Sequence, residues 1–93
     1  MNAALVLALV VAGSAAAPAH AQSAAAGMDN WFRGHSAAWQ QNAAPCVRYL
    51  SQAENVEAEM IELNQRRPRD IAQLNARTAE RTRLLVRFRD CAN

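Results

Sequence analysis

The chain has 93 residues, enough for one small domain. Its ten basic residues are all arginines, and together with the eight acidic residues they lie from Asp29 onward. The formal net charge of +2 at pH 7 is too small to argue for a nucleic-acid ligand, so binding to nucleic acid is not expected.

Residues 1–21 are typical of a cleaved secretory signal peptide. An apolar run over residues 3–13 is followed by APAHAQ, in which Ala19 and Ala21 fit the small-x-small rule for cleavage before Gln22. The run is shorter than the roughly 20 residues that a membrane span needs. No basic residue precedes it, and the alternative is an uncleaved helix next to the membrane. We expect a mature protein that begins at Gln22 and is soluble, in the periplasm or secreted.

Residues 22–28 are uncharged and mostly small, and they predict a flexible tether in front of the domain. A first helix is then expected over about residues 29–42. Asp29 or Asn30 can cap its start, and Gly34 weakens its middle.

A long amphipathic helix is predicted over about residues 44–65. Its apolar residues recur at alternating spacings of three and four, which is the period of one face of an α-helix. Pro45 suits the first turn, because the N–H that proline lacks has no helical partner there. The apolar stripe consists of Cys46, Tyr49, Ala53, Val56, Met60 and Leu63.

A second long helix is predicted over about residues 68–91, after a break at NQRRPRD. Pro68 cannot sit in the interior of a helix, but it can open one. Asp70 then falls in the first turn, where a negative charge meets the positive end of the helix. The apolar residues of this helix are Ile71, Leu74, Leu84, Leu85, Val86 and Phe88.

Cys46 and Cys91 are predicted to form a disulfide that closes the open end of an antiparallel helical hairpin. A small exported domain with two cysteines is typically cross-linked. If the two cysteines face each other, the chain folds back within the NQRRPRD break, which was identified independently. The same register places Glu57 near Arg81. It also pairs Leu63 with Leu74, Ala53 with Leu84, and Tyr49 and Leu50 with Phe88.

An intermolecular bridge and a metal or redox site are the alternatives for the two cysteines. The sequence has no C-x-x-C motif, and after the predicted cleavage His35 is the single histidine left as a further ligand. Structural zinc sites normally use four ligands. We therefore expect neither a metal nor a cofactor.

Four residues of the first predicted helix form an aromatic group: Trp31, Phe32, His35 and Trp39. Three of them recur every four residues and so share a helix face. One interpretation is that this face packs onto the hairpin and completes a three-helix mini-bundle. The other is that it stays partly exposed and contacts a protein partner, since tryptophan is enriched at binding hot spots. The four residues are our candidates for partner binding.

Charge is divided between the two long helices. Residues 44–65 carry one arginine against four glutamates, and residues 66–90 carry eight arginines against two aspartates and one glutamate. Complementary charges between the helices account for part of this pattern. The alternative is a binding site for phosphate or carboxylate groups, which suit guanidinium. Its candidates are Arg66, Arg67 and Arg69 in the break and Arg83 and Arg87 farther along.

The sequence offers no catalytic constellation. It has no nucleophile–base spacing and no glycine-rich phosphate loop, and a hairpin of this size has little room for a concave pocket. We expect residues 29–93 to form a small all-α domain that is not an enzyme. Its expected function is to bind another envelope protein, as an accessory, inhibitor or chaperone-like factor. The alternative is arginine-mediated binding to lipid headgroups or lipopolysaccharide.

Overall fold

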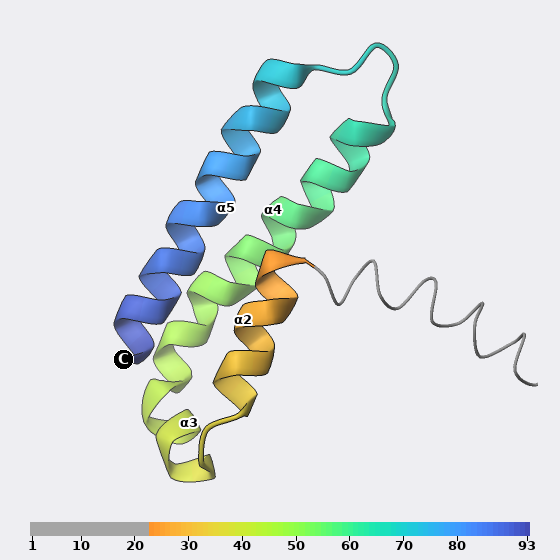
Figure 1. The fold of residues 1–93 in the computed structure, drawn as a ribbon. Helices are drawn as coiled ribbons and strands as arrows, with labels where there is room; N and C mark the ends of the chain where they lie inside the picture. Colours follow the sequence, from red (N-terminus) through yellow and green to blue (C-terminus); the bar gives the residue numbers. More distant parts are fainter. Residues whose placement is uncertain (1–22) are drawn as a thin grey trace, which may run out of the picture.

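The computed structural model describes residues 23–93, and the predicted signal peptide lies outside this range. These residues form an all-helical fold without strands, as predicted (Figure 1). No helix within them is both long enough and apolar enough to cross a membrane. The elements in chain order are α2 (Ala24–Arg33), α3 (Ala37–Ala43), the 3₁₀ turn η1 (Ala44–Cys46), α4 (Val47–Gln65) and α5 (Ile71–Ala92).

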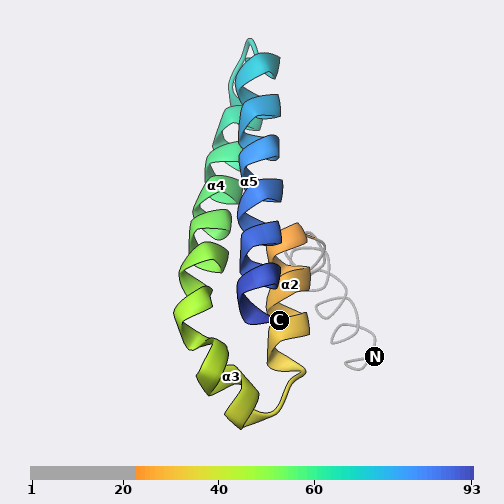
Figure 2. The ribbon, with the colours of Figure 1, turned by 90° about the vertical axis from the view of Figure 1, so that its left-hand side faces the viewer.

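The long helices α4 and α5 lie antiparallel, side by side, and form the predicted hairpin (Figures 1 and 2). The prediction that Pro68 opens the second helix is wrong, because α5 begins at Ile71. Asp70 has extended backbone and caps α5, and its side chain accepts a hydrogen bond from the Gln73 N–H. An aspartate in this position satisfies a backbone donor that the helix itself cannot.

The N-terminal part of the domain differs from the prediction in two ways. The predicted tether over residues 22–28 is wrong, because α2 already begins at Ala24 and Ala25 is fully buried. The predicted helix over residues 29–42 is divided into α2 and α3. Both helices have serine caps: the Ser23 hydroxyl accepts from the Ala26 N–H, and the Ser36 hydroxyl accepts from the Trp39 N–H.

The core lies between the hairpin and the N-terminal helices, at the disulfide end of the molecule. Of the predicted stripe on α4, Tyr49 and Met60 are half-buried and the other residues are buried. On α5 the expected burial fails for Ile71 and Val86, which are 55% and 52% exposed. Val86 is two residues from the buried Phe88, and two residues turn an α-helix by about 200°, so their side chains point to opposite sides. The main buried cluster is Ala25, Phe32, Ala43, Cys46, Leu50, Ala53, Leu85, Phe88 and Ala92.

The helix α2 covers one half of the hairpin. It begins beside the middle of α4 and runs toward the disulfide end, so that the half of α4 and α5 near their connecting link extends beyond it (Figures 1 and 2). The molecule is therefore a three-helix bundle at one end and a two-helix hairpin at the other. The change in thickness leaves one face of α4 and α5 uncovered in the half near the link.

Candidate functional site

The predicted disulfide joins Cys46, at the end of η1, to Cys91, in the last turn of α5, with 5.7 Å between the Cα atoms. Both cysteines are used in this bond, so the alternatives of an intermolecular bridge and a thiolate metal site are not what the structure shows. The bond holds the open end of the hairpin beside the N-terminal helices. It is a structural element and leaves no free thiol among residues 23–93.

The aromatic group predicted from the sequence packs against the hairpin. Trp31 and Phe32 meet the ring of Phe88 on α5, with centroid distances of 6.1 and 5.5 Å. Phe32 and Phe88 are buried, whereas Trp31, His35 and Trp39 are half-buried. The packing interpretation of this face is therefore the one that the structure supports.

His35 lies at the edge of this aromatic group. Its ring stacks on Trp39 with a centroid distance of 3.7 Å, and its Nδ1 lies 2.9 Å from the Trp31 carbonyl oxygen. The ring is thus held by packing and by one hydrogen bond of its own helix. Within residues 23–93 no three histidine, cysteine, aspartate or glutamate residues gather as they would around a metal ion.

The five candidate arginines lie in two separate groups. Arg66 pairs with Glu62 at 3.0 Å, and Arg67 and Arg69 are hydrogen-bonded to Asn64. These three lie in the link, outside α4 and α5. The structure does not bring the second group close to them, since it lies about 18 Å farther along α5 by helix rise. That second group, Arg83 and Arg87, is exposed and forms no ion pair with any residue of 23–93.

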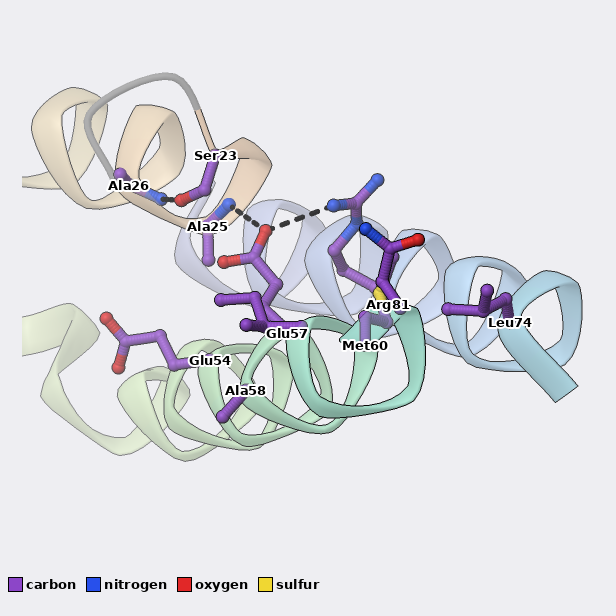
Figure 3. Close-up of a pocket in the computed structure, with 11 residues that line it drawn as sticks. Ser23, Ala25, Ala26, Glu54, Glu57, Ala58, Met60, Leu74 and Arg81 are labelled. Atoms are coloured by element: carbon purple, nitrogen blue, oxygen red, sulfur yellow. Dashed lines mark hydrogen bonds and ion pairs between the residues drawn. The ribbon is translucent and has the colours of Figure 1, made fainter. Parts of the chain in front are cut away.

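A groove with a volume of about 870 Å³ lies beside the start of α2 (Figure 3). It is the uncovered continuation of the space that α2 fills at the other end of the hairpin. The groove is open to solvent, and the expectation that a hairpin of this size has little room for the concave pocket that catalysis needs stays a prediction. We call this feature the α2 groove; its lining residues are Ser23, Ala25, Ala26, Glu54, Glu57, Ala58, Met60, Ile61, Asn64, Leu74 and Arg81.

The α2 groove is apolar along its middle and polar at its ends. Alanine and larger aliphatic side chains make up more than half of the lining residues. Ile61 is 62% exposed, the highest value among the large exposed hydrophobic residues of the described chain. Ile61 thus adds an exposed aliphatic side chain to the apolar middle of the groove.

One carboxylate joins the three helices that meet at the groove. Glu57 Oε2 accepts a hydrogen bond from the Ala25 N–H of α2 and one from Arg81 Nη1 of α5, both at 3.2 Å (Figure 3). The side chain of Glu57 is 12% exposed and that of Arg81 is 24% exposed, so water competes little for either group. The Glu57 charge also lies at the positive end of α2, where a helix dipole favours an anion.

The predicted proximity of Glu57 and Arg81 is confirmed, but the groove itself was not expected. Sequence reasoning missed Ile61 because it lies beside the apolar stripe of α4 and outside its spacing. It missed the contact between Glu57 and Ala25 because residues 22–28 were read as a tether. Ser23 followed by three alanines was a usable signal for a capped helix start.

A comparison of the chain with protein-family models, curated proteins and solved structures found no match.

Proposed function

We propose that the protein is a small exported binding protein without catalytic activity, and that the α2 groove is its contact surface for another envelope protein. The observation that carries this proposal is the exposed Ile61 in an apolar groove between two rigid helices. The signal peptide over residues 1–21 and a soluble location outside the cytoplasm belong to the same proposal, supported by the disulfide, which is favoured in an oxidising compartment.

A helix with an apolar face is the kind of ligand that fits the groove. The chain itself provides the precedent, since α2 lies on the other half of the same hairpin through small side chains such as the buried Ala25. A partner helix in line with α2 would cover Ile61 and Leu74 in the same manner. Binding of an amphipathic helix in an apolar groove is a common mode of peptide recognition.

The second candidate function is arginine-mediated binding to an anionic envelope component, such as lipid headgroups or lipopolysaccharide. The observation that favours it is the pair Arg83 and Arg87, whose charges are exposed and not neutralised by ion pairs within residues 23–93. The two residues are four apart on α5 and so share one helix face. This face is distinct from the α2 groove, and the two functions are separable by mutation.

The test is affinity capture from an envelope extract with the tagged chain that begins at Gln22. Ile61→Asp should abolish capture, because it places a charge where an apolar surface must be buried. The matched control is Val86→Asp, which alters a side chain of similar exposure (52%) that does not line the groove. If both variants capture the same proteins as the wild type, the groove is not the contact surface. Capture that is lost in Arg83→Glu and at high salt would instead favour the anionic ligand.

A further inference from the structure

Opposite charges lie at the two ends of the α2 groove. Glu54 and Glu57 line the end formed by α2, and Asn64 lines the other end. Arg67 and Arg69 of the link do not line the groove, but they lie next to this end through their hydrogen bonds to Asn64. Asn64 holds both arginines in place. Its carbonyl oxygen accepts a hydrogen bond from Arg67 Nη1, and its Oδ1 accepts one from Arg69 Nη1, each at 3.0 Å.

The acidic end has charge available for a partner. Glu54 is exposed and forms no ion pair within residues 23–93, whereas Glu57 is already paired with Arg81. Between the two charged ends lie Ile61 and Leu74. Along α4 the surface therefore runs from the acidic end of the groove, through its apolar middle, to the link arginines just beyond Asn64.

When a second copy lies antiparallel, the acidic end of each copy meets the basic link of the other, and the apolar middles meet each other. Glu54 is seven residues before Ile61, and position 68, between Arg67 and Arg69, is seven residues after it. With a two-fold axis beside Ile61, the isoleucines of the two copies meet, and each Glu54 faces the link arginines of the other copy. In such an isologous contact every favourable pair occurs twice.

We infer that a second copy of this chain occupies the α2 groove, so that the link of each copy lies against the start of α2 in the other. The inference rests on the proposal that the groove is a protein-contact surface, and it differs from that proposal in the occupant, which is a second copy in place of another envelope protein. The partner's hairpin covers the half of α4 and α5 that α2 leaves open (Figure 2). The two uncovered hairpin halves together form a four-helix packing unit, which buries apolar residues better than two helices do.

The test is sedimentation equilibrium of the oxidised chain that begins at Gln22, over a range of protein concentrations. The average mass of the wild type should rise from one copy to two. Ile61→Asp should raise the dimer Kd by about tenfold or more, since burial of one isoleucine corresponds to at least that factor and two are lost. Val86→Asp should leave the Kd unchanged, and circular dichroism should show both variants to be folded.

A charge exchange tests the orientation of the two copies. Glu54→Arg should weaken the dimer by about fivefold, because it sets like charges against each other at both ends. The double variant Glu54→Arg with Arg69→Glu should restore part of the lost affinity, because it returns opposite charges to both ends while Arg66 and Arg67 remain. A dimer weakened by the first change and not strengthened by the second would overturn the antiparallel arrangement.

The outcomes for the two proposals are distinguishable. A wild type that is monomeric at every concentration, or a dimer that Ile61→Asp leaves intact, overturns the inference. If Ile61→Asp nevertheless abolishes capture of an envelope protein, the proposed function stands without self-association. A dimer that depends on Ile61, with no other protein captured, supports the inference and refutes the binding of another envelope protein.

Discussion

Removal of the disulfide should bring the domain close to the limit of its stability. The bond joins residues 45 apart in sequence. Closing a loop of this size lowers the chain entropy of the unfolded state, and this stabilises the folded domain by about 4 kcal/mol. The free energy of unfolding of a domain with this number of residues is about 4 to 10 kcal/mol. A single covalent bond thus accounts for a large share of the stability.

The perturbation is the double variant Cys46→Ala and Cys91→Ala, with the reduced wild type as its companion. Alanine avoids a hydroxyl at position 46, where the cysteine is only 4% exposed. The melting temperature of the double variant should fall by roughly 15 to 30 °C, from the usual shift per kcal/mol for domains of this size. Thermal and urea unfolding followed by circular dichroism measure both quantities.

The reduced wild type separates loop closure from packing. It keeps both sulfur atoms and loses only the covalent link, so it should unfold at nearly the temperature of the double variant. A reduced protein as stable as the oxidised one would refute the reasoning, because the loop-closure contribution would then be negligible. Native mass spectrometry, which detects the two hydrogens added on reduction, confirms that the bond was broken.

Three further changes test the packing. Phe88→Ala should lower the free energy of unfolding by about 3 to 5 kcal/mol in urea titrations, because a fully buried ring is lost; a change below 1 kcal/mol would contradict its place in the core. Glu57→Gln should speed amide hydrogen exchange in α2 far more than in α5, since it weakens the hold of Arg81 and of the α2 backbone; equal effects in both helices would count against the shared carboxylate. Trp31→Ala with Trp39→Ala should lower the melting temperature along with any partner binding, and an unchanged melting temperature would favour an unpacked aromatic face.

The hairpin was predictable because its determinants are local and periodic. The apolar stripe of α4 repeats at helical spacing, and the break after it gives the fold-back point. These two facts together determine which residues oppose each other, and therefore both the disulfide and the contact of Glu57 with Arg81. The start of α5 was predicted at Pro68 because both a proline and an aspartate suit the beginning of a helix. In the structure Asp70 is the cap, and the helix begins after it.

The groove was not predictable in the same way, because it depends on where α2 begins along the hairpin. That position is set by contacts between residues 32 apart, such as the hydrogen bond from Ala25 to Glu57. An alanine-rich segment has high helix propensity, but nothing in its own sequence states which part of α4 it will cover. Ile61 lies beside the apolar stripe of α4, and it stays exposed because α2 covers only the other half of the hairpin.

The position of the disulfide also determines how the molecule responds to proteolysis. The link between α4 and α5 is exposed and contains Arg66, Arg67 and Arg69, so it is the natural place for a trypsin-like enzyme to cut. Cys46 precedes the link and Cys91 follows it, and a single cut there leaves two fragments joined by the bond. The bundle at the disulfide end, with its aromatic core, keeps every one of its helices. A nicked molecule would migrate as two pieces only after reduction, and a single cut would leave the link arginines on fragments that the disulfide still joins, without releasing α5.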